Sequence, residues 1–109
     1  MAYNIYLTPR AQADIAAAFA YLKERSPQAA VRWYNCITAD IVTLRQMPER
    51  CPALHAASVE CRQLIRGRYR VVFDIVENTK TVRVLTVRHS ARREITDGEI
   101  HQIMHDFEQ

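Results

Sequence analysis

Two helix-start signals stand 18 residues apart near the beginning of the chain. Thr8-Pro9 and Ser26-Pro27 each place a hydroxyl residue directly before a proline. The hydroxyl accepts a backbone N–H of the first helical turn, and proline fits there because it has no N–H to satisfy. The signals predict one helix to about Arg25 and a second to about Met47. Almost no residues remain for a loop between them, so the two helices must form an αα-hairpin.

Both predicted helices carry an apolar face. Apolar residues recur at every third or fourth position, which places them on one side of an α-helix. The first helix presents Ala11, Ile15, Phe19 and Leu22, and the second presents Ala30, Trp33, Tyr34, Ile37, Ile41 and Leu44. A hairpin with one apolar side has to be covered by another layer of structure, which the rest of the chain must supply.

Strand patterns on either side of the hairpin supply that layer. Residues 3–7 form a short run rich in Tyr and Ile before the first helix. After a loop with two prolines, alternation and β-branched residues predict three strands, over residues 62–65, 69–76 and 81–89. Short turns separate these three strands, so we expect them to pair in an antiparallel sheet.

The tail begins with a further helix-start signal. Thr96 and Glu99 form a capping box, and Ile95 with Ile100 forms a hydrophobic staple around it. The helix that follows carries an apolar stripe of Ile100, Ile103, Met104 and Phe107. We expect this stripe to fold back on the sheet or to contact a partner protein.

The order of these elements predicts an α+β fold. An N-terminal strand is followed by an αα-hairpin packed on a small antiparallel sheet (β-α-α-β-β-β), and a C-terminal helix completes the chain. At 109 residues the chain can bury one modest core and is too short for two. We therefore expect a single domain over residues 1–109.

All of the excess positive charge lies in the predicted sheet. Residues 61–93 hold nine Lys or Arg and two Asp or Glu, a net charge of +7, whereas the other residues hold six and ten, a net charge of −4. A basic stripe on a rigid sheet attracts polyanions or an acidic protein partner. A generic nucleic-acid-binding domain is disfavoured, because the basic strands lack interleaved aromatic residues beyond Tyr69.

Composition also disfavours membrane, secreted and metal-binding proteins. No apolar run approaches the ~20 residues that cross a bilayer. The N-terminus lacks the pattern of a signal peptide, so we expect a cytoplasmic protein with no membrane partner. Three cysteines without CxxC spacing are typical of reduced structural thiols. His101 and His105 lack a third ligand at a recognisable spacing, so we expect no metal and no other cofactor.

Motifs in a recognisable order run through nearly the whole chain. The helical part contributes Thr8-Pro9, Ala11, Asp14, Ile15, Ser26-Pro27, Ala29, Trp33, Ile37, Leu44 and Pro48. The sheet contributes Arg62, Leu64, YRVVF at residues 69–73, VLTVRH at 84–89 and ARR at 91–93. In this order they resemble the RelE/ParE superfamily of bacterial type II toxins, also called plasmid stabilisation proteins. Two features depart from the family: Cys51 stands where many relatives have glycine, and the C-terminal helix is longer than in many ParE-type relatives.

This resemblance implies a toxin with an antitoxin partner. RelE-like members are ribosome-dependent endoribonucleases that cut mRNA, whereas ParE-like members poison DNA gyrase and are not enzymes. Both are neutralised by a small ParD- or RelB-like antitoxin encoded beside them, whose usually acidic C-terminal segment wraps the toxin. The HSARR sequence at residues 89–93 is closer to the ParE type, so we expect a gyrase inhibitor. An mRNA endonuclease and a degenerate, non-toxic member that binds the antitoxin are the alternatives.

The two activities require different site residues. RNA cleavage needs a group that takes a proton, a cation at the phosphate and an acid for the leaving oxygen. Arg70 matches the family's phosphate-contacting arginine, and His89 is the candidate base or acid, so these two are catalytic only if the protein is a nuclease. Arg62 and Arg66 stand where RelE has lysines, and arginine is a poor proton shuttle. For target binding by a gyrase inhibitor, the basic candidates are Arg68, Arg88, Arg92 and Arg93.

Purely structural roles are open for the same residues. Arg70 can pair with Asp74, which follows on the same face of the predicted strand. The basic cluster at residues 88–93 can be a solvated strand end. His89 can be a strand-end histidine held by a hydrogen bond.

Overall fold

The computed structural model describes residues 2–54, 60–91 and 95–107. In chain order its elements are β1 (Asn4–Leu7), α1 (Pro9–Arg25), α2 (Pro27–Val42), β2 (Arg62–Arg66), β3 (Tyr69–Val76), β4 (Thr81–His89) and α3 (Asp97–Phe107). Short 3-10 turns at Thr43–Arg45, Pro48–Arg50 and Glu77–Thr79 lie in the connections. The predicted α+β fold and its element order are confirmed.

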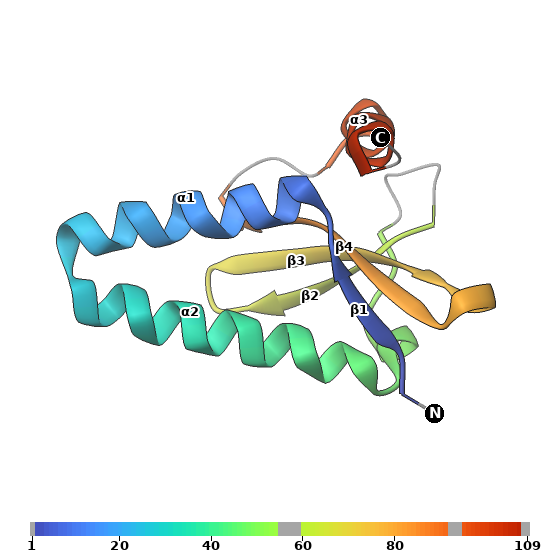
Figure 1. The fold of residues 1–109 in the computed structure, drawn as a ribbon, viewed down its shortest axis with the longest axis horizontal. Helices are drawn as coiled ribbons and strands as arrows, with labels where there is room; N and C mark the ends of the chain where they lie inside the picture. Colours follow the sequence, from blue (N-terminus) through green and yellow to red (C-terminus); the bar gives the residue numbers. More distant parts are fainter. Residues whose placement is uncertain (1, 55–59, 92–94, 108–109) are drawn as a thin grey trace.

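The two long helices form the predicted hairpin, which Figure 1 shows joined at its tip. Thr8 caps α1 by accepting the Ala11 N–H at 3.1 Å. Ser26 caps α2 by accepting the Ala29 N–H at 3.2 Å. Each cap is followed by its proline at the start of the helix, as the sequence predicted.

The second helix is shorter than predicted. It ends at Val42 rather than near Met47, and a single 3-10 turn follows it. Met47 adopts a left-handed conformation with φ of 48°, which cannot continue a right-handed helix. Pro48 follows directly, and a proline disfavours helical geometry in the residue before it. The backbone conformation at Met47 and Pro48 therefore prevents the helix from continuing, although apolar residues at helical spacing reach Leu44.

The described strands form one sheet in the order β1-β4-β3-β2. β2, β3 and β4 pair antiparallel as predicted, whereas β1 pairs parallel with β4, so the sheet is mixed. Parallel pairing needs a long connection between the two strands. The hairpin and the β2–β3 pair, which lie between β1 and β4 in the chain, supply it (Figure 1).

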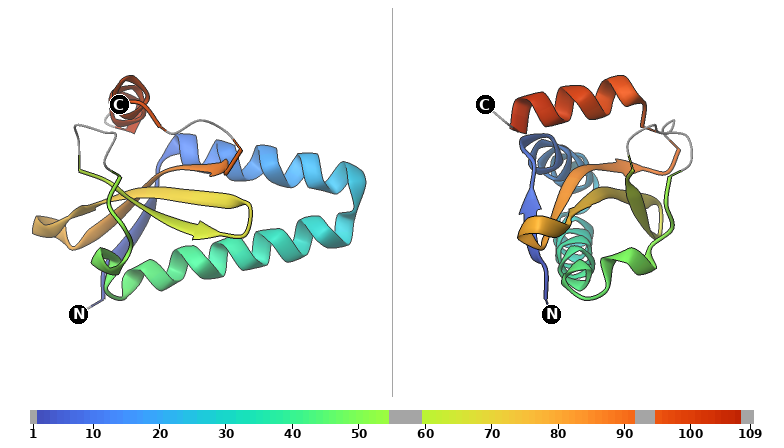
Figure 2. Two further views of the ribbon diagram at one scale, coloured as in Figure 1. Left: turned by 180° about the vertical axis from the view of Figure 1, so that it is seen from behind. Right: turned by 90° about the vertical axis from the view of Figure 1, so that its right-hand side faces the viewer.

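Two apolar clusters of described residues cover the two faces of the sheet. One joins the hairpin to the sheet and includes Ile15, Ile37, Val71 and Phe73. The other joins α3 to the sheet and includes Val72, Leu85, Ile95, Ile100 and Ile103, with Met104 packed against it. Figure 2 shows α3 beside α1 and away from α2. The C-terminal stripe thus folds back on the sheet, although the Phe107 side chain lies outside the described part of the chain.

Thr8 also ties α1 to β4. Its hydroxyl lies 2.8 Å from the carbonyl oxygen of Val84 and 3.0 Å from that of Leu85, and the residue is completely buried. At this point β4 has one residue more than β3, because the pairing register shifts between Val72 and Phe73. Leu85 is the extra residue, so it forms a β-bulge.

Valine at position 8 tests this double contact. Valine keeps the branched shape but leaves the Ala11 N–H without its acceptor, so we expect Thr8→Val to lower the free energy of unfolding by about 2 kcal/mol. Urea denaturation measures the change. Ser26→Ala removes the cap of the other helix and should cost about 1 kcal/mol. Equal losses would show that Thr8 acts only as a helix cap.

Candidate functional site

A groove lies between α1 and the end of β4, and we call it the β4 groove. Its volume is about 650 Å³, which is in the range of ligand-binding sites. It is lined by Asp14, Ala17, Ala18, Tyr21 and Leu22 from α1, and by Arg68, Tyr69, Val87, Arg88 and His89 from the strands and the turn before β3. Two of the predicted site residues, Arg68 and His89, therefore meet at this groove, and Arg88 is part of its lining while its guanidinium binds Glu99 of α3.

His89 is held in one orientation in the β4 groove. Its Nδ1 accepts a hydrogen bond from the Ala91 N–H at 3.0 Å. Its ring lies edge-on to that of Tyr69, with 5.3 Å between the ring centres. A neutral imidazole whose Nδ1 accepts a hydrogen bond carries its proton on Nε2. In this arrangement Nε2 carries the N–H, so His89 is suited to donating a hydrogen bond to an anion and not to taking a proton.

Tyr69 links His89 to the hairpin. Its ring centre lies 5.1 Å from that of Trp33 on α2. Burial raises the pKa of the Tyr69 phenol above its ordinary value of 10.0, so the phenol stays protonated at neutral pH. The three rings support the end of the sheet, and in this state neither Tyr69 nor His89 offers a base.

Arg88 is buried and bound to α3. It is 2% exposed, and it donates a hydrogen bond of 2.9 Å to Glu99. Arg10 of α1 lies 3.8 Å from the same carboxylate and binds Asp14 at 3.2 Å. The hydrogen bond from Arg88 holds the pKa of Glu99 below its ordinary value. The role of Arg88 in target binding stays a prediction, while its charge already has a partner within the chain.

Arg70 and His89 lie on opposite faces of the sheet. Tyr69 is paired with His89, and Arg70 is paired with Arg88. Successive residues of a strand point to opposite faces. Arg70 therefore shares the face of Arg88, and it is not among the residues that line the β4 groove. The structure does not bring the two candidate nuclease residues together.

The other basic residues predicted to bind a target are Arg68, Arg92 and Arg93. Arg68 is exposed and lines the β4 groove. Arg92 and Arg93 lie outside the described residues, and their roles stay predictions. Asp74, which the sequence suggested as a partner within β3, binds Arg83 of β4 through two hydrogen bonds of 2.9 and 2.5 Å. That cross-strand pair gives Asp74 a structural role.

Two acidic residues shape the site in ways that spacing did not reveal. Asp14 accepts hydrogen bonds from the Val87 N–H, at 3.1 Å, and from the Thr86 hydroxyl, so it holds α1 against β4. Sequence reasoning used Asp14 only within the family motif and Glu99 only as a capping residue. The cap is confirmed, with hydrogen bonds of 3.2 Å in both directions between Glu99 and Thr96. The contacts of Asp14 with β4 and of Glu99 with Arg88 join different elements of the fold, so no short-range sequence pattern predicts them.

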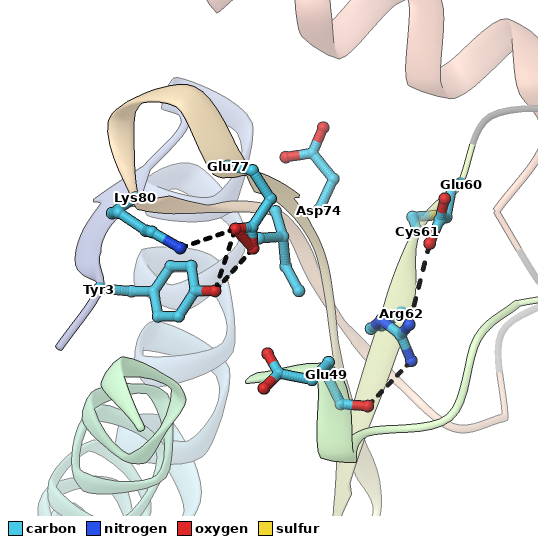
Figure 3. Close-up of a pocket in the computed structure, with 9 residues that line it drawn as sticks. Tyr3, Glu49, Glu60, Cys61, Arg62, Asp74, Glu77 and Lys80 are labelled. Atoms are coloured by element: carbon cyan, nitrogen blue, oxygen red, sulfur yellow. Dashed lines mark hydrogen bonds and ion pairs between the residues drawn. The ribbon is translucent and has the colours of Figure 1, made fainter. Parts of the chain in front are cut away.

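A second cavity, of about 450 Å³, lies at the other end of the sheet (Figure 3). Its charged lining consists of Glu49, Glu60, Asp74 and Glu77 with Arg62 and Lys80. Glu77 binds the Tyr3 hydroxyl at 2.6 Å and Lys80 at 3.0 Å, and the hydrogen bond from Tyr3 lowers the pKa of Glu77. Four carboxylates against two cations do not suit an anionic partner. We therefore take the β4 groove as the candidate site.

Across residues 2–54, 60–91 and 95–107, no three His, Cys, Asp or Glu side chains gather as a metal site. Within the same residues no helix combines the length and apolar character needed to cross a membrane.

Comparison with known proteins assigns the family. The model of the family described as the ParE toxin of the type II toxin–antitoxin system parDE matches residues 5–94. The chain belongs to this family of toxins, in agreement with the resemblance seen in its motifs. No curated protein matches the chain.

Two solved structures share the fold. The toxin–antitoxin complex RelBE2 from Mycobacterium tuberculosis contains a chain that is 21% identical, with a TM-score of 0.62 and coverage of 84% of this chain and 95% of that one. The chromosomal ParDE system from P. aeruginosa contains a chain that is also 21% identical, with a TM-score of 0.63 and coverage of 80% and 95%. At this level of identity the likeness establishes the fold alone.

Glutamine at position 99 tests the contact between α3 and Arg88. The folded chain lowers the pKa of Glu99 below the ordinary value of 4.5. Its charge therefore stabilises the fold above pH 4.5, and this contribution is lost as the pH falls through the lower, folded pKa. We expect Glu99→Gln to lower the free energy of unfolding at pH 7 by about 1 kcal/mol and to have a smaller effect in acid.

Urea denaturation at both pH values measures this difference. Glutamine also serves in a capping box, so the substitution removes mainly the charge. Asp106→Asn is the matched control, because Asp106 accepts a hydrogen bond from Gln102 within α3 and is exposed. A loss in Glu99→Gln that is the same at every pH would contradict the charge contact.

Proposed function

We propose that this chain arrests bacterial growth by binding DNA gyrase and does not cut RNA. Membership of the ParE toxin family supports the proposal, since gyrase poisoning is what the ParE type of sequence implies. The protein then acts in the cytoplasm, where gyrase works on DNA.

The observation that carries this choice is the separation of Arg70 from His89. An RNA-cleaving site needs its cation and its proton-transfer groups within hydrogen-bond reach of one scissile bond. Side chains on opposite faces of a sheet do not meet that condition. The hydrogen bond from Ala91 to Nδ1 of His89 further disfavours a general base at this position.

A gyrase inhibitor needs a complementary surface rather than a converging acid and base. We assign target binding to the basic end of the sheet, where Arg68 is exposed and Arg92 and Arg93 follow β4 in the chain. Arg88 lies beneath this end, bound to Glu99. Positive charge in this position favours encounter with an acidic protein surface or with gyrase-bound DNA.

We further propose that a ParD-like antitoxin neutralises the chain. The two solved relatives in fold are described as a toxin–antitoxin complex and as a ParDE system. The net charge of +7 over residues 61–93 suits an acidic antitoxin segment.

Induced expression in a bacterial host tests the proposed target. We expect growth arrest with a raised DNA-damage response and intact mRNA, together with inhibition of gyrase supercoiling by the purified protein. Codon-phased mRNA cuts without damage signalling would contradict gyrase inhibition and would identify the chain as an mRNA endonuclease. The observation that favours this second function is the grouping of Arg68, Tyr69 and His89 in one groove. No arrest by a folded protein would indicate a member that binds the antitoxin but is not toxic.

Substitutions distinguish the two activities in the same assay. We expect His89→Ala to retain toxicity, because a gyrase inhibitor uses no proton transfer at this position. The double change Arg92→Ala with Arg93→Ala should reduce gyrase inhibition about tenfold or more, because it removes two charges from the proposed target-binding end. Arg32→Ala, at an exposed position on α2, is the control and should have little effect. Loss of toxicity in His89→Ala alone would favour the nuclease.

A further inference from the structure

Four hydrogen-bond donors line the β4 groove, and the described part of the chain offers them no acceptor. They are the guanidinium of Arg68, the Nε2–H of His89 and the hydroxyls of Tyr21 and Tyr69, and we call them the donor cluster. Nδ1 of His89 is bound to the Ala91 N–H, which leaves Nε2 as the donating nitrogen. A ligand that accepts hydrogen bonds from several directions would satisfy these groups.

Backbone pairing places three members of the donor cluster side by side. The Ser90 N–H donates to the Arg68 C=O at 2.6 Å, which ties the turn before β3 to the end of β4. Tyr69 is paired with His89 in the register, and their ring centres are 5.3 Å apart. Trp33 of α2 supports the Tyr69 ring from a distance of 5.1 Å between ring centres. The backbone positions of residues 68, 69 and 89 are therefore fixed relative to one another before any ligand binds.

The fourth member, Tyr21, lies on α1 close to Tyr69. Burial raises the pKa of the Tyr69 phenol, and the neighbouring Tyr21 phenol adds to the increase. The second effect requires the two phenols to be near each other in space. The Tyr69 hydroxyl therefore keeps its proton at neutral pH and donates beside Tyr21. Because Tyr21 is far from the basic strands in the sequence, only the folded chain brings this second aromatic residue to them.

The charge that a ligand meets in the groove is positive. Arg68 is exposed, and among the described residues no carboxylate lies within ion-pair distance of it. Asp14, the acidic residue of the lining, is already bound to Arg10 and to β4. The guanidinium of Arg25 lies 3.8 Å from the centre of the Tyr21 ring, which places a second positive charge beside the lining. The groove therefore favours an anion.

A phosphate group suits the donor cluster better than a carboxylate. A guanidinium binds two phosphate oxygens as a fork, and the tetrahedral phosphate keeps further oxygens for donors in other directions. The two oxygens of a carboxylate lie in one plane with its carbon, so they cannot face donors on several sides. At about 650 Å³ the groove also has room for a group attached to the phosphate. Ala17, Ala18 and Leu22 of α1 offer that group an apolar wall.

We propose that the β4 groove is a nucleotide site, in which the donor cluster holds a phosphate group and the apolar wall of α1 contacts the nucleoside. Arg70, for which the family resemblance implies a phosphate contact, lies on the other face of the sheet, so this site is a separate one. The inference goes beyond the proposed function, because it requires neither gyrase nor cleavage. A free nucleotide and a nucleic-acid strand present the same phosphate chemistry, and the choice of probe distinguishes them.

Calorimetry on the purified full chain tests the phosphate contact. The probes are the four ribonucleoside 5′-monophosphates, the matching nucleosides without phosphate and a single-stranded oligonucleotide of ten residues. We expect at least one monophosphate to bind about tenfold or more tightly than its nucleoside. A strand that binds more tightly than every monophosphate would assign the phosphate to nucleic acid, and the reverse order would assign it to a free nucleotide. Absence of binding, or equal affinity for nucleosides and monophosphates, would overturn the proposal.

Two pairs of variants test the donors with the same probes. Tyr69→Phe removes a hydroxyl and keeps the ring packing, so it should weaken binding about fivefold. Tyr34→Phe is its control on the exposed side of α2, outside the groove. Arg68→Ala should weaken binding about tenfold or more, whereas Arg32→Ala removes an exposed charge of α2 and should alter the affinity by less than about twofold. Equal losses within both pairs would show long-range attraction only and would overturn the site.

Nuclear magnetic resonance of the histidine rings locates the ligand. We expect the tightest-binding probe to shift the Nε2 resonance of His89 and to leave those of His101 and His105, which are exposed on α3, unchanged. Shifts confined to the two histidines of α3 would place the ligand elsewhere and overturn the proposal. Displacement of the nucleotide by a ten-residue glutamate peptide at a lower concentration than by the oligonucleotide would assign the groove to protein carboxylates and overturn it as well. None of these measurements contains gyrase, so a failed gyrase assay leaves the nucleotide site standing.

Discussion

The contact between the start of α1 and the bulge of β4 sets the position of every group around the groove. Thr8 binds the carbonyl oxygens of Val84 and of the bulge residue Leu85, and Asp14 binds the Val87 N–H beyond the bulge. These partners are backbone groups of β4, and the hydroxyl of Thr86 adds one side-chain hydrogen bond to Asp14. The extra residue, Leu85, also reverses the alternation of faces that follows it. Without it Arg88 would point to the hairpin, and with it Arg88 points to α3.

The charge of Arg88 explains the position of the C-terminal helix. Arg70 lies opposite Arg88 in the register, so two positive side chains share one face of the sheet. Like charges in that position repel each other. Glu99 brings a carboxylate to Arg88, and Arg10 approaches the same group from α1. The C-terminal helix therefore covers apolar residues and also brings a carboxylate to the basic end of the sheet.

Much of the fold could be predicted, and most of the site could not. The caps at Thr8 and Ser26 predicted both helix starts, and the capping box of Glu99 predicted the third. The parallel pairing of β1 was not predicted, because a short apolar strand carries no sign of its direction. Arg70 and His89 were grouped because the family resemblance implies a phosphate contact for Arg70 and because His89 can serve as a base or acid, but alternation places them on different faces. Asp14 and Glu99 were recognised as residues of the pattern without their partners.

The sequence by itself determined the helix starts, the strands, the family and the concentration of positive charge in residues 61–93. These follow from interactions within about four residues and from composition. Only the tertiary structure decided which basic groups line the β4 groove, which are bound within the chain and how α1 covers the part of β4 that extends beyond β1. The physical reason is the pairing register. A single extra residue in β4 changes the face of every side chain after it, and that shift exists only once β3, β4 and α1 have come together.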